Sequence, residues 1–110
     1  LHGDYYPGSW LQTSNGIKII DPEFCFYGSS EFDFGVLIAH LKLAQQPESL
    51  VQQVFAQIEP VPNFKQSLLQ QFTGVEIMRR LLGLAQLPLN MSLPIKKQLL
   101  NEAYKLIIEY

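Results

Sequence analysis

Two short apolar segments near the start of the chain, residues 9–13 (SWLQT) and 17–20 (IKII), are separated only by Ser14-Asn15-Gly16. An Asn-Gly pair supplies the positive φ angle that a tight hairpin turn requires. The two segments are therefore predicted to pair as antiparallel strands. Such a turn would bring the loop before the first strand close to the loop after the second.

After residue 30 the apolar pattern becomes helical. Residues 30–33 (SEFD) are typical of a helix cap, and apolar side chains then recur at helical spacing. Pro47 suits the start of a second helix, and Pro60 and Pro62 end it. The predicted helices run over residues 30–46, 48–58, 63–86 and 92–110. A hairpin followed by a helical bundle predicts the α+β class.

The composition is unusual for a free-standing domain of 110 residues. Hydrophobic residues make up 47% and charged residues only 16%, whereas typical soluble domains carry about 25% charged residues. A shortage of charge indicates that part of the surface is normally covered. Because the chain begins at Leu1 rather than at a methionine, we expect it to be a piece of a longer protein. We also expect the apolar surface left uncovered to allow self-association, for example as a homodimer.

Several classes of function are disfavoured by charge and residue content. The net charge of -2 argues against a nucleic-acid partner, which needs clustered Lys and Arg. The sequence has neither a signal-peptide pattern nor an apolar run of membrane-spanning length, so no membrane association is predicted. A single cysteine, Cys25, excludes an internal disulfide and is compatible with the reducing cytoplasm. Cys25, His40 and the aromatic residues Phe24, Phe26 and Tyr27 are predicted to be packed in the interior.

Two carboxylates follow the second predicted strand in Asp21-Pro22-Glu23. In an extended segment residues i and i+2 point the same way, so Asp21 and Glu23 would face one site. Paired carboxylate oxygens suit a hard cation such as Mg²⁺. The alternative interpretation is an ordinary polar turn after a strand.

The loop before the first strand, HGDYYPGS, also allows two interpretations. Asp4 is either a turn residue, with Pro7-Gly8 completing the bend, or a base held close to a substrate hydroxyl. In the second case Ser9 would offer an oxygen to a metal or a phosphate. The predicted hairpin would bring Asp4 and the later carboxylates to one cleft, as phosphoryl transfer requires. His2 is expected to hold this loop by hydrogen bonds.

Two adjacent arginines, Arg79 and Arg80, lie in the third predicted helix. Helical spacing places Arg79 on the same face as the apolar residues Phe72, Val75 and Leu82. An arginine there is costly unless it meets an anion or reaches a cleft. Arg80 is turned away from that face and would form a surface pair with Glu76.

The order of these motifs resembles the C-terminal lobe of the kinase-like small-molecule phosphotransferases, the superfamily of the aminoglycoside and choline kinases. Within it, Ser9, the Asp-Pro-Glu motif and the Arg79-Arg80 pair are most similar to the methylthioribose kinases. The stretches DPEFCFYGSSEFDFG and GVEIMRRLLGLA are similar to that family throughout. The resemblance extends over residues 1 to about 86.

The resemblance implies a role for each motif. Asp4 would be the catalytic base, Asp21 and Glu23 the Mg²⁺ ligands, and Ser9 the residue at the second metal position. Asp33 would brace the catalytic loop, and the arginine pair would line the sugar site. Residues 1–30 would form the loops and hairpin of a partial C-terminal lobe, and residues 31–110 its helical part.

The activity implied is transfer of the γ-phosphoryl group of ATP to a hydroxyl of a small sugar, 5-methylthioribose in methionine salvage, with Mg²⁺. The nucleotide-binding N-terminal lobe is absent from the 110 residues, so we expect them to be inactive alone. One alternative is an aminoglycoside or choline type of kinase acting on another small sugar or alcohol. The other is a non-catalytic binding module, which Tyr5-Tyr6 favours because the family has Leu-His there.

Overall fold

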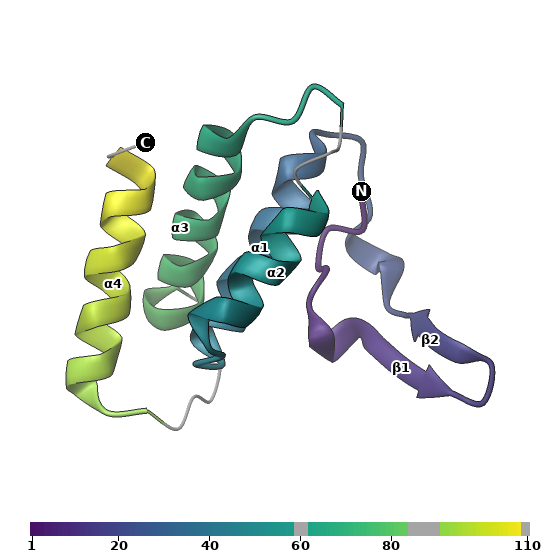
Figure 1. The fold of residues 1–110 in the computed structure, drawn as a ribbon, viewed down its shortest axis with the longest axis horizontal. Coiled ribbons are helices and arrows are strands. Elements are labelled where there is room, and N and C mark those ends of the chain that lie inside the picture. The colour runs from purple at the N-terminus through teal and green to yellow at the C-terminus, as the bar shows by residue number, and fades with distance from the viewer. Residues whose placement is uncertain (59–61, 84–90, 109–110) are drawn as a thin grey trace.

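The computed structural model describes residues 1–58, 62–83 and 91–108. Figure 1 shows an antiparallel hairpin at one side of the molecule and the helices at the other. The predicted α+β class is confirmed. The elements are the strands β1 (Trp10–Thr13) and β2 (Gly16–Ile19) and the helices α1 (Ser30–Leu43), α2 (Glu48–Ile58), α3 (Gln66–Leu82) and α4 (Leu93–Ile108).

The predicted hairpin is confirmed, and its turn is closed by Thr13 and Gly16. Trp10 lies opposite Ile19 and Thr13 lies opposite Gly16, so only two residues connect the strands. Gly16 has a φ of 100° and supplies the left-handed conformation that the turn needs. The Thr13 Oγ1 hydroxyl donates to the Gly16 carbonyl oxygen at 2.7 Å, which holds the turn closed.

The predicted helices are present, with differences at their ends. α1 ends at Leu43 rather than at residue 46, and α2 has the predicted bounds. α3 begins at Gln66 rather than at Asn63. Asn63 has a φ of 59°, in the left-handed region, and a right-handed helix cannot start in that conformation. α3 ends at Leu82, with Gly83 as its extended C-cap, so the predicted continuation to residue 86 already fails at Gly83. Residues 84–86, the stop at Pro60 and the last two positions of α4 lie outside the described residues.

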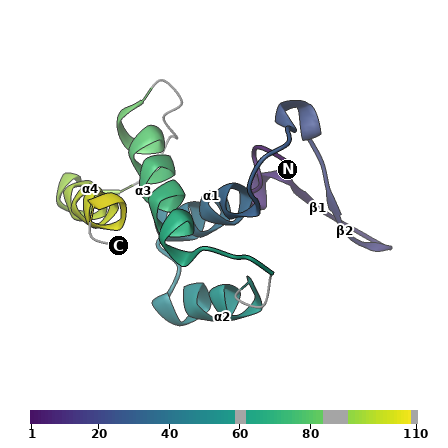
Figure 2. The same ribbon diagram turned by 90° about the horizontal axis from the view of Figure 1, so that it is seen from above.

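The core lies between α1, α3 and α4. In Figures 1 and 2, α3 lies between α1 and α4, while α2 packs to one side of α1. α1 is buried continuously from Gly35 to His40, as expected for a helix with neighbours on several sides. The central cluster consists of Ala39, Leu43, Ile77, Leu99 and Ala103.

A glycine sets the closest approach of α1 to α3. A Cβ atom at Gly35 would lie 2.8 Å from the Cβ of Phe72 and 3.2 Å from the Leu69 carbonyl oxygen. The Gly35 carbonyl oxygen also accepts a hydrogen bond from Thr73 Oγ1 at 3.3 Å. The two helices therefore pack backbone against backbone at this point.

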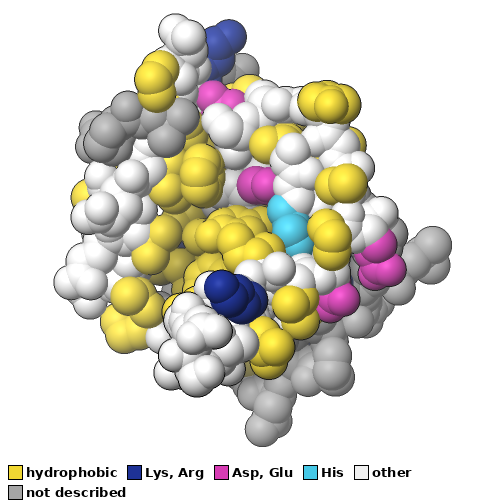
Figure 3. Space-filling view, turned by 90° about the vertical axis from the view of Figure 1, so that its right-hand side faces the viewer, with side chains coloured by type: hydrophobic (Ala, Val, Ile, Leu, Met, Phe, Trp, Pro, Cys, Tyr) yellow, Lys and Arg dark blue, Asp and Glu magenta, His cyan; other side chains and the backbone are white. Residues whose placement is uncertain are grey.

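The hairpin side of the molecule exposes many apolar side chains, as the space-filling view in Figure 3 shows. Ile17 is 66% exposed and Ile19 57% exposed. The predicted burial of Cys25, Phe26 and Tyr27 is wrong, because all three are exposed. The described elements leave this segment uncovered, so an aromatic composition alone does not bury it.

None of the helices in the described ranges combines the length and the apolar character needed to cross a bilayer.

We predict that Gly35→Ala lowers the free energy of unfolding by about 1–3 kcal/mol, because the new methyl group would overlap α3. This loss would occur although Ala is favoured over Gly inside a helix by roughly 1 kcal/mol. Chemical denaturation of the purified protein measures the change. Ser67→Ala, at an exposed position of α3, is the matched control and should leave stability nearly unchanged. A Gly35→Ala protein as stable as the wild type would show that the contact is loose.

Candidate active site

The loop of residues 2–9 is fixed to α1 by Asp33. The two carboxylate oxygens of Asp33 accept the backbone N–H groups of His2, at 2.7 Å, and of Gly3, at 2.9 Å. The predicted capping of α1 by residues 30–33 is wrong, since the residue at the N-cap is Ser29 and its side chain makes no cap hydrogen bond. Asp33 lies in the first turn of the helix, where the macrodipole favours a carboxylate.

His2 ties the same loop to the end of the hairpin. Its Nε2 lies 2.8 Å from the Ile20 carbonyl oxygen, and its Nδ1 accepts the Asp4 backbone N–H at 3.2 Å. Because a carbonyl oxygen only accepts, Nε2 must carry the proton and Nδ1 must be unprotonated. A neutral His2 therefore connects the backbone of Asp4 to the residue that precedes Asp21.

Ser9 closes the loop from its other end. It is buried, and its hydroxyl donates to the Asp4 carbonyl oxygen at 2.9 Å. Its own carbonyl oxygen accepts the Ile20 N–H at 2.8 Å. The prediction that the hairpin brings the two loops together is thus confirmed.

The segment with Asp21 and Glu23 is not extended, contrary to the prediction. Asp21 has a φ of 57°, and Pro22–Phe24 form a single 3₁₀ turn closed by the Cys25 N–H on the Pro22 carbonyl oxygen at 3.0 Å. The fixed φ of proline suits the first position of such a turn, which explains the difference. Both carboxylates are exposed.

The donor chemistry at these positions fits Mg²⁺, which is commonly held by one or two carboxylates together with phosphate oxygens. The described residues contain no group of three or more His, Cys, Asp or Glu side chains close enough to hold a metal ion. The hydroxyl proton of Ser9 is already engaged by the Asp4 carbonyl. Asp21 and Glu23 thus offer a partial ligand set rather than a complete cage.

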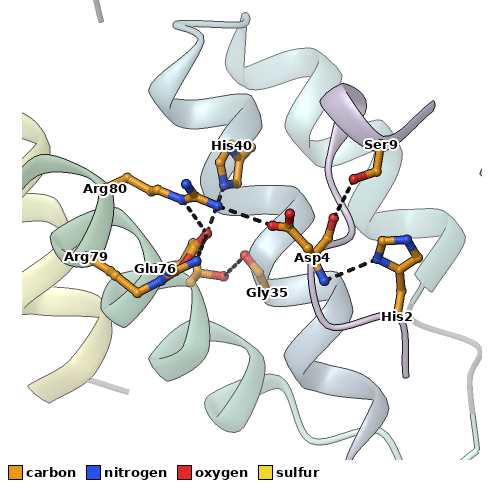
Figure 4. A network of polar contacts seen from close by, with 9 residues as sticks. His2, Asp4, Ser9, Gly35, His40, Glu76, Arg79 and Arg80 are labelled. Atoms are coloured by element: carbon orange, nitrogen blue, oxygen red, sulfur yellow. Dashed lines mark hydrogen bonds and ion pairs between the residues drawn. The ribbon is translucent and has the colours of Figure 1, made fainter. Parts of the chain in front are cut away.

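A network of charged side chains surrounds Glu76, as Figure 4 shows. Glu76 is 4% exposed, and its carboxylate accepts hydrogen bonds from His40 Nε2 at 2.8 Å, Arg79 Nε at 2.7 Å and Arg80 Nε at 3.1 Å. Arg80 Nη2 also donates to Asp4 Oδ1 at 3.2 Å. A continuous path of polar contacts therefore runs from α1 through α3 to the loop carboxylate.

The face of α3 on which helical spacing places Arg79 with Val75 and Leu82 is largely exposed and is not the buried face of the helix. Val75 is 53% exposed and Leu82 64% exposed, and the side chain of Arg79 on that face is 46% exposed. The buried residues of the helix are Leu69, Thr73, Gly74, Glu76 and Ile77. Arg80, predicted to lie at the surface, has a side chain only 12% exposed. The apolar pattern of the sequence did not indicate this buried face because the face contains the charged residue Glu76.

The charges in this network favour the ionised form of Glu76. Burial alone raises the pKa of Glu76, but the hydrogen bonds from His40, Arg79 and Arg80 outweigh burial and lower the pKa to about 2. The hydrogen bond to Glu76 raises the pKa of Arg79 in turn, against the smaller opposing effect of burial. Both members of the Glu76–Arg79 pair are charged at neutral pH.

An open pocket of about 490 Å³ lies beside Asp4. Its polar lining comes from Asp4, Glu76, Arg79 and Arg80. Its apolar lining comes from Phe32, Val36, Phe72 and Val75. The pocket has the size of a small-molecule site and suits a ligand with both hydroxyl groups and an apolar part.

Sequence reasoning missed Glu76 and His40 as parts of this site. The spacing of Glu76, Arg79 and Arg80 at i, i+3 and i+4 was a signal, because such residues are neighbours on a helix. His40 was correctly predicted to be packed inside. Its contact with Glu76 joins residues 36 positions apart and carries no local signal.

The chain is similar in sequence to several methylthioribose kinases. It is 50% identical over 48 residues to the methylthioribose kinase of Exiguobacterium sibiricum, covering 44% of this chain and 12% of that protein. An alignment of 117 residues with the methylthioribose kinase of Geobacillus thermodenitrificans is 32% identical and covers 77% of this chain and 30% of the relative. With methylthioribose kinase 1 of Oryza sativa subsp. japonica, identity is 46% over 44 residues, or 40% of this chain and 10% of that protein.

The chain is thus a relative of the methylthioribose kinases, and the resemblance inferred from its motifs is confirmed. In these alignments it spans less than a third of the relatives' own length. No protein-family model and no solved structure matches the chain.

We predict that acid destabilises the protein partly through Glu76. Its pKa of about 2 in the folded state lies below the ordinary value of 4.5, so the unfolded state takes up the proton first as the pH falls. Ionised Glu76 contributes about 3 kcal/mol to the free energy of unfolding, as calculated from the difference between its pKa of about 2 in the folded state and the ordinary value of 4.5. This stabilisation is fully present above about pH 4.5 and is lost progressively towards pH 2.

Denaturant titrations between pH 2 and pH 6 on the wild type and on Glu76→Gln would measure this dependence. The variant should show a flatter fall of stability with acid. Parallel curves for the two proteins would mean that Glu76 is not held ionised by its partners.

Proposed function

We propose that these residues are part of the C-terminal lobe of a kinase-like phosphotransferase, a cytoplasmic enzyme that transfers the γ-phosphoryl group of ATP to a hydroxyl of 5-methylthioribose in methionine salvage. The observation that carries this proposal is the position of Asp4, whose carboxylate meets Arg80 at the edge of the pocket while its backbone is fixed by His2 and Ser9. The similarity to methylthioribose kinases supports the choice of substrate.

Asp4 is the proposed catalytic base. Its side chain is 22% exposed, so one part is fixed by Arg80 and another remains accessible from the pocket. A substrate hydroxyl within hydrogen-bond reach would be oriented by the carboxylate and would give up its proton to it as the phosphoryl group arrives. The hydrogen bonds to the Asp4 backbone and the contact of Arg80 with its carboxylate restrict the movement of this group.

Arg79 is the proposed substrate-binding arginine. It lines the pocket and keeps nearly half of its side chain accessible. A guanidinium group presents several donors in one plane and can hold two oxygens of a sugar at once. Phe72 and Val75 on the same wall would accommodate the apolar end of a thiosugar.

Asp21 and Glu23 are the residues proposed to hold Mg²⁺, with Ser9 at the second position. The ion, when bound, supplies positive charge that neutralises the phosphate oxygens. The 110 residues contain no Gly-rich phosphate-binding motif. We therefore propose that a separate N-terminal lobe covers the phosphates of the nucleotide.

We predict that the full-length gene product, assayed with Mg²⁺ and ATP against 5-methylthioribose, an aminoglycoside and choline, turns over the thiosugar. Asp4→Asn should lower kcat by about 10²–10⁴-fold, because the amide cannot accept the proton. Glu48→Gln, which removes an exposed carboxylate on α2 away from this pocket, is the control.

Two results would contradict the proposal. Turnover of the aminoglycoside or choline without the thiosugar would reject the substrate. Unchanged turnover by Asp4→Asn would reject Asp4 as the base, whichever substrate is used.

A further inference from the structure

We propose that Glu76 is a positioning residue of this site, whose buried carboxylate holds the guanidinium groups of Arg79 and Arg80 in fixed orientations and, through Arg80, orients Asp4. The consequence for catalysis depends on the proposed function. The geometric role of Glu76 does not.

The two arginines use Glu76 differently. Arg79 donates to both carboxylate oxygens, from Nε at 2.7 Å and from Nη2 at 3.2 Å, so its guanidinium plane is fixed by a two-point contact. Arg80 donates to Glu76 from Nε at 3.1 Å and to Asp4 Oδ1 from Nη2 at 3.2 Å. Because a guanidinium group is planar, fixing Nε also fixes the direction in which Nη2 points.

The orientation of Glu76 is itself determined by a second helix. His40 on α1 donates from Nε2 to Oε2 of Glu76 at 2.8 Å, and both side chains are 5% exposed. A carboxylate with donors on both oxygens cannot rotate without breaking several hydrogen bonds. The distance between α1 and α3 at this point therefore determines the positions of the guanidinium groups of Arg79 and Arg80.

Tyr6 covers this network from the loop side. Its ring centroid lies 4.4 Å from that of His40, and Arg80 Cζ lies 5.8 Å from the same tyrosine ring centroid. The ring thereby shields the Glu76 contacts from water, which strengthens charge-assisted hydrogen bonds. Tyr6 is one of the two residues at which the loop departs from the family pattern, and here it packs against the network.

Charge balance explains why a carboxylate is needed at position 76. Arg79 and Arg80 are adjacent cations, and Glu76 and Asp4 are the anions that meet them. Without the charge of Glu76, two guanidinium groups would compete for Asp4, and Arg80 would lose the contact that fixes its plane. Asp4 would then be held in a different orientation relative to the substrate hydroxyl.

The geometric role can be tested without any enzymatic assay. In protein labelled with ¹⁵N-arginine, the Nε–H protons of Arg79 and Arg80 should exchange slowly with water, because both donate to a buried carboxylate. Glu76→Gln should accelerate the exchange of both by at least about tenfold. Glu31→Gln, the same change at another buried carboxylate, which accepts the Lys65 backbone N–H, should leave both unchanged. Unchanged exchange in Glu76→Gln would overturn the proposal.

The catalytic consequence is tested with the full-length gene product. Glu76→Gln should lower kcat by about 10–100-fold, as expected when a group supporting a reactive residue is lost. Glu76→Asp keeps the charge and should recover part of that loss, which a purely structural role would not predict. Glu31→Gln, the control, should keep the wild-type kcat. If the kinetic constants of Glu76→Gln stayed within about twofold of the wild type, the proposed effect of Glu76 on catalysis would be overturned.

The two proposals fail in different ways. A wild-type protein that phosphorylates none of the substrates would reject the proposed function, while arginine exchange would still decide the role of Glu76. If Glu76→Gln does not fold, Glu76→Asp serves in both experiments. Its shorter side chain cannot keep all four hydrogen bonds at the present distances, so exchange of the arginine Nε–H protons should be faster than in the wild type. Wild-type exchange in Glu76→Asp would overturn the proposal.

Discussion

The Glu76 carboxylate is the interaction on which the arrangement of this site depends. It joins α3 to α1 through His40, and it joins α3 to the loop through Arg80 and Asp4. A buried carboxylate is tolerated only when its partners replace the water that it has lost. Here three side chains do so with four hydrogen bonds, and the same hydrogen bonds that stabilise the charge also orient both arginines.

A second set of contacts holds the loop from the opposite side. Asp33 accepts two backbone N–H groups, and His2 links Asp4 to the end of β2. The loop is thus attached to a helix and to the hairpin at its start, and Ser9 closes it near its end. Asp4 is therefore placed by backbone contacts on one side and by a charged side chain on the other, beside a pocket lined by both polar and apolar side chains.

The fold was largely predictable because its signals are local. The Asn-Gly turn and the helical spacing after residue 30 predicted the hairpin and the helices with their approximate bounds. The errors arose where a nonlocal contact or a single backbone angle decided the outcome. Residues 30–33 were predicted to cap α1, but the N-cap is Ser29 and Asp33 binds the loop, while Asn63 was predicted to open α3 but takes a left-handed conformation.

The sequence by itself determined the α+β class, the meeting of the two loops across the hairpin and the similarity to methylthioribose kinases. Only the tertiary structure decided which face of α3 is buried, and with it the roles of the two arginines. Periodicity identified an apolar face, whereas the chain buries the face that carries Glu76. The physical reason is that the cost of burying this carboxylate is removed by His40, a residue 36 positions away, together with two arginines on the same helix.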